Sequence, residues 1–249
     1  MIKFFRNIRY RMARDNQFFN YSKYAVGEIV LVVLGILIAI QINEWNDHRK
    51  DLLKKKNLLK SLEVEFNQNL EQLDTVLSYD VLVVESSLEF LKLKADDPIV
   101  NNAKYMALLL QNTSWNWTYD PQNGALRSGI SSGDINLIKN EPLINALFGW
   151  RDVVVDAKEN EERSLTTRLE AKSVIEKHVR NVDYRSTDRK ELGQSKFKSD
   201  YKGLIRDPLF EDYISDRYAR MLDAVLELKT VRELNIQILE LIKEAQNEE

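Results

Sequence analysis

The sequence predicts an all-α protein in which one N-terminal transmembrane helix continues into an elongated antiparallel helical bundle. Three observations carry this prediction. Residues 25–42 form an almost unbroken apolar run. After it, apolar residues recur in long stripes with a period of about 3.6 residues, which is the period of an α-helix. The 249 residues include only 8 Gly and 4 Pro but 30% charged residues, a composition that favours long helices over many turns.

The composition also limits the function classes. A formal net charge of −3 gives no general attraction to nucleic acid, so we expect no nucleic-acid partner. The chain has no cysteine, which excludes disulfides, thiolate catalysis and Cys-based metal sites. About 205 residues remain outside the N-terminal segment and the apolar run, enough to bury a substantial core.

Residues 1–23 are predicted to be a basic cytoplasmic tail. Ile2, Phe5, Ile8 and Met12 recur at three- and four-residue spacing between basic residues. This pattern is typical of an amphipathic helix on an anionic membrane surface. A disordered basic tail would have the same composition, and both interpretations stay open.

Residues 24–45 are predicted to be the transmembrane helix. The apolar run is about 18 residues long, close to the minimum for a hydrocarbon core of about 30 Å. Tyr21, Tyr24 and Trp45 flank it as interface anchors. The run is apolar on all sides, whereas a core helix of a soluble protein usually has one apolar stripe. No A-x-A-like cleavage site ends it, so we expect an uncleaved anchor rather than a signal peptide.

Three residues inside the predicted span are candidates for interaction or coupling. Glu28 lies about one turn from the N-terminal border, where it could reach the interface or pair with Lys23. It could instead be a protonatable carboxylate that faces a partner helix. Gly35 and Ala39 form a small-xxx-small pair, a spacing that lets two helices approach closely.

The charges near the span predict its orientation. Six Lys or Arg residues precede it, and short positive segments are usually retained in the cytoplasm. Basic residues also follow the span, from Arg49 to Lys60, and oppose this assignment. Large domains translocate largely regardless of charge. We therefore expect a bacterial inner-membrane protein with a cytoplasmic N-terminus and a periplasmic C-terminal domain.

Residues 46–249 are predicted to be the helical bundle, which begins with a stalk over residues 46–94. No Gly or Pro occurs between residues 43 and 97, and Pro98 ends the helix. Asn67 and Asn69 lie near the apolar stripe and either fix the register or are solvated. The stripe consists of Leu59, Leu62, Phe66, Leu70, Leu73, Leu77, Val81, Val84, Leu88 and Leu91.

Residues 101–111 are predicted to form a second helix. The aromatic residues at 115–119 predict either a short extended segment or an aromatic plug, with a sugar-binding platform as a lesser alternative. Further on, Gly133 is a helix stop and Asn140 a helix cap that precedes Pro142. The short helices expected here resemble helix-turn-helix in spacing, but they lack a basic recognition face.

The C-terminal half is predicted to contain two long helices. Residues 142–182 show a helical stripe whose charged middle, residues 159–163, is expected to be exposed or loosened. Residues 184–207 are polar and are expected to form a long connection that is mobile or functional. Asp207 and Pro208 are a cap and a first-turn proline, so a helix is expected from there to about residue 245.

No motif predicts catalysis or cofactor binding. The sequence has no phosphate-binding loop, nucleophile elbow or His-rich pattern. His48 and His178 lack a second histidine at ligand spacing and are interpreted as surface or titrating residues. The carboxylates alternate with Lys and Arg and are interpreted as solvated. We therefore predict no catalytic, cofactor-binding or metal-binding residues.

Three blocks carry a family resemblance: MIKFFRNIRY, YAVGEIVLVVLGILIAIQINEWN and SGDINLIKNEPLINALFGW. The chain resembles an uncharacterised family of single-span membrane proteins from Bacteroidota. The resemblance implies a membrane location and an α-helical domain. The family is of unknown function, so it supplies no catalytic residues.

These observations favour a non-enzymatic single-pass membrane protein that acts through protein interactions, as a scaffold, a sensor-like module or a subunit of an envelope complex. The expected partners are the lipid bilayer and another membrane or envelope protein, with a homo-oligomer as an alternative. A second hypothesis is an accessory subunit of an ion-coupled membrane machine that uses Glu28. A third is an envelope hydrolase, which would need a cleft with carboxylates in unequal environments.

Overall fold

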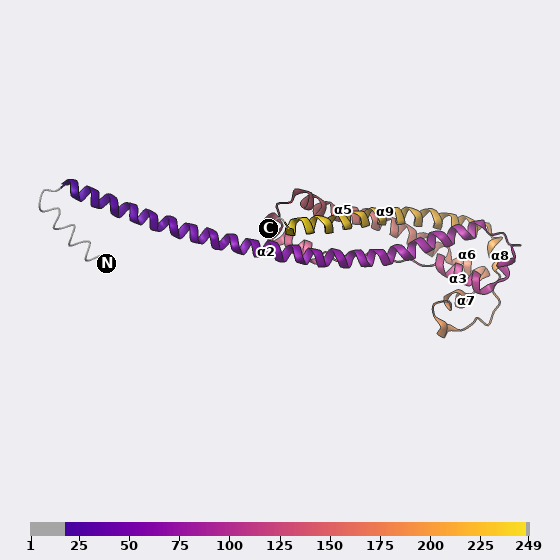
Figure 1. The fold of residues 1–249 in the computed structure, drawn as a ribbon. Coiled ribbons are helices and arrows are strands. Elements are labelled where there is room, and N and C mark those ends of the chain that lie inside the picture. The colour runs from indigo at the N-terminus through magenta and orange to yellow at the C-terminus, as the bar shows by residue number, and fades with distance from the viewer. Residues whose placement is uncertain (1–17, 248–249) are drawn as a thin grey trace. The chain divides into compact units, whose positions relative to one another are not determined.

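The computed structural model describes residues 18–247, and for residues 18–21 the backbone alone (Figure 1). Most of the predicted basic tail lies outside these residues. The chain divides into two compact units, Met1–Lys55 and Lys56–Glu249. Each unit is described by itself.

Helix α2 covers Phe18–Lys92 and contributes residues to both units. It contains Gly27 and Gly35 only near its start and no Pro, so nothing in its sequence interrupts it. It ends where the Lys94 amide donates to Oδ2 of Asp97 at 2.7 Å, just before Pro98. The structure thus confirms the predicted helix up to Lys92.

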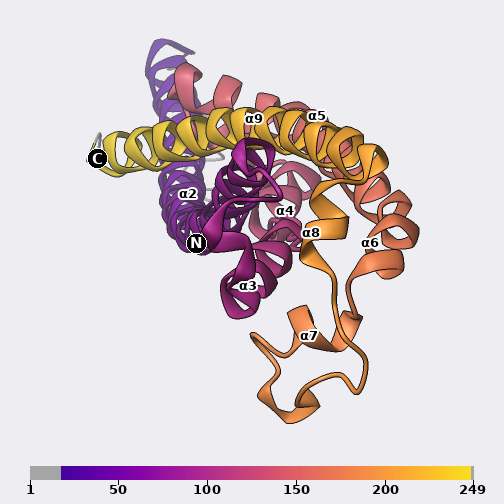
Figure 2. The ribbon, with the colours of Figure 1, turned by 90° about the vertical axis from the view of Figure 1, so that its right-hand side faces the viewer.

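In the unit Lys56–Glu249, residues 56–92 of α2 lie beside α5 (Glu141–Glu170) and α9 (Pro208–Asn247) (Figures 1 and 2). Helix α9 runs antiparallel to α2, as three cross-helix pairs show. These are Glu63 with Gln246 at 3.0 Å, Asp74 with Arg232 at 2.6 Å, and Phe90 with Phe210 at 5.3 Å between ring centroids.

Helix α5 runs parallel to α2 and antiparallel to α9. Its Trp150 packs edge-on against Phe66 of α2 at 5.0 Å, and the carbonyl of its Ser164 accepts a hydrogen bond from Arg217 of α9 at 2.9 Å. The predicted all-α antiparallel bundle is therefore confirmed within this unit.

Shorter helices complete the unit, and caps fix where some of them begin and end. Asn140 accepts from the Leu143 amide at 3.0 Å, and Gly133 ends a helix with φ of 77°, both at predicted positions. The shorter elements are η1 (Pro98–Asn101), α3 (Ala103–Thr113), α4 (Gly124–Ser132), η2 (Asp134–Leu137), α6 (Lys172–His178), α7 (Asn181–Arg185), η3 (Lys190–Leu192) and α8 (Tyr201–Ile205).

The core of this unit consists of two apolar clusters. The first is built around Leu59, Leu62, Phe66, Trp150 and Ile238. The second lies toward the other end of the bundle and includes Phe90, Met106, Leu110, Ile175 and Phe210. Along α9, Ile214 belongs to the second cluster and Val225 to the first, so the stretch between them separates the two.

The predicted continuous helix over residues 142–182 is wrong. The segment consists of α5, α6 and α7: a turn at Ala171 separates α5 from α6, and the extended Val179 separates α6 from α7. At the second break the His178 carbonyl accepts from the Asp200 amide at 2.9 Å. This break brings Ile175 and Val179 into the second cluster. Residues 184–207 are also more ordered than expected, since they contain η3 and α8.

The predicted stripe of α2 is correct in its first half and shifts in its second. Val81, Val84 and Leu88 are only half-buried, and Leu91 is 37% exposed. The fully buried positions there include Asp80, Ser86, Ser87 and Phe90. Polar residues thus occupy part of the buried face, which a stripe of apolar residues alone could not indicate.

Candidate functional site

A buried polar cluster lies in the core of the unit Lys56–Glu249 and extends from the boundary between the two apolar clusters into the first of them. It consists of Asp80 on α2, Tyr119 on the connecting segment 114–123, Glu161 on α5, and Arg217 and Asn235 on α9. Each of these residues is at most 4% exposed. Buried ionisable groups are costly unless they are paired, which makes the cluster the first candidate for function.

Arg217 is the centre of the hydrogen bonding in the cluster. Its Nε donates to the Thr113 carbonyl at 3.2 Å, and its Nη1 donates to the Ser164 carbonyl at 2.9 Å. Its Nη2 donates to the Trp115 carbonyl, and Asn116 Oδ1 lies 3.5 Å from Nη1. One guanidinium therefore joins the end of α3, the segment after it and α5 to α9.

Glu161 anchors the same connecting segment from α5. Its Oε1 accepts the Tyr119 amide at 3.0 Å. Burial raises the pKa of Glu161 to about 8, with smaller contributions from the carboxylates Asp80 and Asp120, while the Tyr119 amide and Lys158 lower it. Residues 159–163 were predicted to be exposed or loosened; Glu159, Glu162 and Arg163 are exposed, and Glu161 is the buried exception.

Asp80 and Asn235 bring buried polar atoms to the cluster that have no partner among the described residues. These atoms are Asp80 Oδ1 and both side-chain polar atoms of Asn235, together with the Tyr119 hydroxyl. Burial raises the pKa of Asp80 to about 7, although the positive charge of Arg217 opposes this. Burial likewise raises the pKa of Tyr119, and the nearby Asn235 amide partly offsets it without reaching hydrogen-bond geometry.

The two carboxyl groups of the cluster have similar environments, because burial raises the pKa of both Asp80 and Glu161. They are therefore not the pair in unequal environments that the hydrolase hypothesis needs. Asp80 is 1% and Glu161 4% exposed. Neither lines any of the four surface depressions described below. Both carboxyl groups are therefore almost inaccessible from the surface, and their contacts lie inside the unit.

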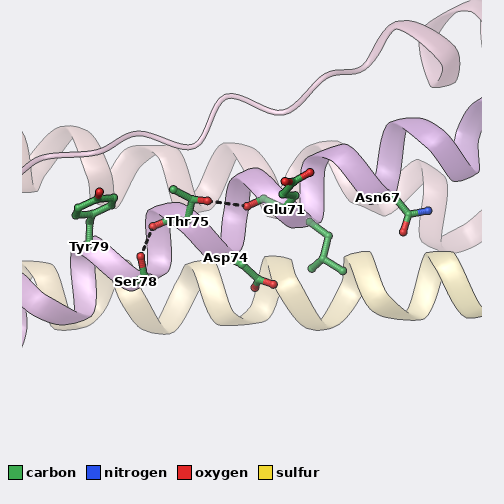
Figure 3. A pocket seen from close by; sticks show the side chains of 7 residues that line it. Asn67, Glu71, Asp74, Thr75, Ser78 and Tyr79 are labelled. Carbon is green, nitrogen blue, oxygen red and sulfur yellow. Dashed lines mark hydrogen bonds between the residues drawn. The ribbon is translucent and has the colours of Figure 1, made fainter.

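The first depression lies along one face of α2, between Asn67 and Tyr79 (Figure 3). Its hydroxyl groups bond within the helix, since Thr75 donates to the Glu71 carbonyl at 3.0 Å and Ser78 to the Thr75 carbonyl at 2.7 Å. Asp74 accepts from Arg232, which also lines a neighbouring depression between α2 and α9. These polar groups do not converge on one point, so the face lacks the geometry of a catalytic site.

The aromatic residues of the connecting segment pack on the same helix. Trp117 stacks on Tyr79 with centroids 4.5 Å apart and planes at 10°, and Trp115 lies 5.6 Å from Tyr79. Trp117 remains 39% exposed. Residues 114–123 have no regular secondary structure. The predicted extended segment is therefore not a strand, and the aromatic plug and the sugar-binding platform stay predictions.

Two grooves have larger apolar linings. One lies between α4 and α5, has a volume of about 710 Å³ and includes the exposed side chains Ile130, Phe148 and Val155. The other lies between α3 and residues 183–201, has a volume of about 690 Å³ and includes the exposed Leu108 and Phe197. Both volumes are in the range of ligand and peptide sites.

The predicted site residues are in the other unit, in helix α2. Tyr24 is 46% and Trp45 66% exposed, and Glu28 is exposed among apolar neighbours. A Cβ added at Gly35 would meet nothing within 4 Å, and Ala39 is exposed. Tyr21 lies in the helix, and its side chain is outside the described atoms.

The residues of the buried cluster were not predicted from the sequence. Their spacing carries a usable signal, because Arg217 follows Ile214 by three residues and precedes Met221 by four on the buried stripe of α9. Asn235 is also flanked by buried residues at helical spacing, since it follows Val231 by four residues and precedes Ile238 by three. A polar residue on an apolar stripe predicts a buried polar contact.

Neither histidine takes part in a metal site. His178 Nε2 lies 2.9 Å from Asp207 Oδ2, where the hydrogen bond to His178 lowers the pKa of Asp207. His48 is exposed. Within residues 18–247, no group of three or more His, Asp or Glu side chains could hold a metal ion.

The comparisons with known proteins give one match. Residues 28–149 match a family described as "Family of unknown function (DUF6090)". No curated protein matches the chain, and no solved structure does. The match covers most of the apolar run, the rest of α2 and the helices up to the first turns of α5, but it ends before Glu161 and Arg217. It indicates no catalytic family.

Proposed function

We propose that this chain is a non-enzymatic, single-pass protein of a bacterial inner membrane, and that its helical unit binds other proteins. The single observation that carries the proposal is the apolar stretch of α2. It contains an 18-residue window long and apolar enough to cross a membrane, and none of that window is buried by the described protein. Side chains such as Ile29 and Leu31 are 63% and 73% exposed.

Lipid is the environment that best explains how this stretch is shielded from water. Burying one such side chain is worth about 1.5–3 kcal/mol, and soluble monomers rarely expose a continuous apolar patch of this size. The stretch is apolar all round, whereas a protein partner would normally cover one side only. Tyr24 and Trp45 at its ends suit the two membrane interfaces.

The proposed topology has residues 1–23 in the cytoplasm and the helical unit in the periplasm. It is supported by the six Lys or Arg residues that precede the span. The resemblance to single-span proteins of Bacteroidota supports the membrane location and not the orientation. In this setting the partner is another membrane or envelope protein, or a second copy of the chain.

Protein binding is supported by the surface of the helical unit. Its ionisable cluster is buried, so an approaching molecule meets the two grooves instead. Both expose large apolar side chains, among them Phe148 in one and Phe197 in the other, at 53% and 74%. Contiguous exposed apolar groups beside charged ones are typical of interaction sites.

Extraction of bacterial membranes with alkaline carbonate tests the anchor. We expect the wild type to stay in the membrane pellet. A variant with Leu31→Arg and Leu34→Arg should move to the soluble fraction, because each arginine costs about 2.5–3.5 kcal/mol at a helix centre. The control Leu226→Arg, at an exposed apolar position of α9, should stay in the pellet. Release of the wild type by carbonate would contradict the proposal.

A second candidate function rests on Glu28, a carboxylate among exposed apolar side chains in the same stretch. As the coupled group of an ion-driven machine, it would have to gain and lose a proton or bind a cation. Glu28→Gln should then abolish activity, while Glu44→Gln on the same helix should not. Wild-type behaviour of the Glu28→Gln variant would end this alternative.

A further inference from the structure

We infer that the groove between α3 and residues 183–201 binds an acidic segment of a partner protein that also carries an apolar side chain. The inference rests on the proposed function, protein binding, and names the site and the chemistry of the partner. Helix α3 forms one wall with Ala103, Lys104, Ala107 and Leu108. Residues of α7, η3 and the segment before α8 form the other (Figure 2).

The second wall is held in shape by one carboxylate. Asp183 accepts the Ser195 amide at 3.0 Å and the Ser199 hydroxyl at 2.6 Å. The Ser199 hydroxyl in turn accepts the Arg180 amide at 2.9 Å. The wall is therefore held by bonds from the Asp183 and Ser199 side chains, and the buried Tyr201 packs its end into the second apolar cluster.

The charge of the groove is positive. Lys104, Lys190 and Lys198 line it and are exposed, and the one carboxylate in the lining, Asp183, is engaged within the wall. Residues 177–206 contain nine Lys or Arg and four Asp or Glu, in a chain whose formal net charge is −3. A segment with several carboxylates is the complementary occupant.

The groove also offers apolar contacts. Leu108, beside Ala107 on the α3 wall, is 49% exposed, and Phe197 on the other wall is 74% exposed. An exposed phenylalanine is unfavourable in water unless something covers it. An occupant with carboxylates and a large apolar side chain would contact the lysines and the exposed apolar side chains at the same time.

The position of the groove favours a protein over a lipid headgroup. It lies at the end of the unit that holds the Phe90–Phe210 pair. Lys56, where the chain enters this unit, lies at the opposite end. Residues 56–92 of α2 separate the two ends by roughly 55 Å at 1.5 Å per residue.

The test uses the full chain in nanodiscs of uncharged lipid and a short fluorescent peptide of alternating Glu and Phe, followed by anisotropy. We expect saturable binding that weakens about tenfold or more with Lys104→Glu plus Lys198→Glu, because the charge contacts become repulsive. The matched control, Lys229→Glu plus Lys243→Glu on α9, should bind like wild type. The same peptide with Gln for Glu should bind much more weakly, and with Ala for Phe likewise.

The inference would be overturned if the peptide bound equally well to the two double variants, or if the wild type bound the Glu and Gln peptides equally well. A third result would also overturn it: the wild type binds phosphatidylglycerol vesicles but not the peptide, and the variant Lys104→Glu plus Lys198→Glu loses vesicle binding. A photocrosslinker at Phe148, in the other groove, separates this failure from that of the proposed function. If the peptide does not bind but envelope proteins crosslink from Phe148, the inference about this groove is wrong and the proposed function, protein binding, stands. If no protein crosslinks from either Phe148 or Phe197, the proposed function itself is contradicted.

Discussion

At the residue scale, Arg217 determines how the connecting segment is held. It is fully buried, and its bonds go mainly to backbone carbonyls of Thr113, Trp115 and Ser164. Trp115 lies in the irregular segment and Thr113 at the end of α3, so their carbonyls lack the amide donor of a helix interior, and leaving them buried and unpaired is costly. The guanidinium suits this role because its donors point in several fixed directions.

Replacing Arg217 should therefore destabilise the helical unit severely. We expect Arg217→Leu to lower the free energy of unfolding by roughly 3–5 kcal/mol, the range for removing one member of a buried polar network. Arg220→Leu, one turn away and exposed, should change it by less than about 0.5 kcal/mol. Urea unfolding followed by tryptophan fluorescence measures both, and equal values would show that the buried bonds contribute little.

Asp80 and Glu161 predict an unusual dependence of stability on pH. Burial raises the pKa of Asp80 from 3.8 to about 7 and that of Glu161 from 4.5 to about 8. The folded state then holds more protons than the unfolded state between these values. The contribution of the two groups to stability is complete below about pH 4 and is lost as the pH rises through about 8.

We expect the thermal midpoint of the wild type to fall between pH 5 and pH 9. The variant Asp80→Asn plus Glu161→Gln should show a clearly smaller fall, because its amides do not ionise and the Gln can still accept the Tyr119 amide. The control Glu162→Gln, the exposed neighbour of Glu161, should keep the wild-type slope. A slope unchanged in the double variant would assign the pH dependence to other groups.

At the element scale, α4 packs closely on α2 through Gly129. A Cβ added there would lie 2.7 Å from Cδ1 of Leu58, which is itself buried. Gly129→Val should destabilise the unit by about 1–3 kcal/mol through overpacking. Gly149→Val, also in a helix but with nothing within 4 Å of the added Cβ, is the matched control and should be close to neutral. Equal losses in the two variants would contradict the close contact.

The elements that could be predicted from sequence are those with local signals. The Asn140 cap, the Gly133 stop and the Pro208 start lie where expected because each acts on its own backbone. The break near Val179 was missed because it depends on a distant bond to Asp200. The buried cluster was missed for the same reason, since its residues are polar and become buried only when separate helices meet.

At the scale of the whole molecule, the two units differ in the polarity of their surfaces. In the unit Met1–Lys55, the apolar side chains of the described residues are exposed, whereas the unit Lys56–Glu249 buries its apolar residues in two clusters. One chain thus has a part suited to lipid and a part suited to water. This division carries the proposal that the protein is anchored by a single span and works on one side of the membrane.

The topology of the chain is the most direct test of that proposal. The chain has no cysteine, so single cysteines introduced as Asn7→Cys and Asp188→Cys report their own location. A small membrane-impermeant maleimide that passes the outer membrane is added to intact cells. The account predicts labelling of Asp188→Cys in intact cells and of Asn7→Cys only after lysis. Labelling of Asp188→Cys only after lysis would place the helical unit in the cytoplasm and contradict it.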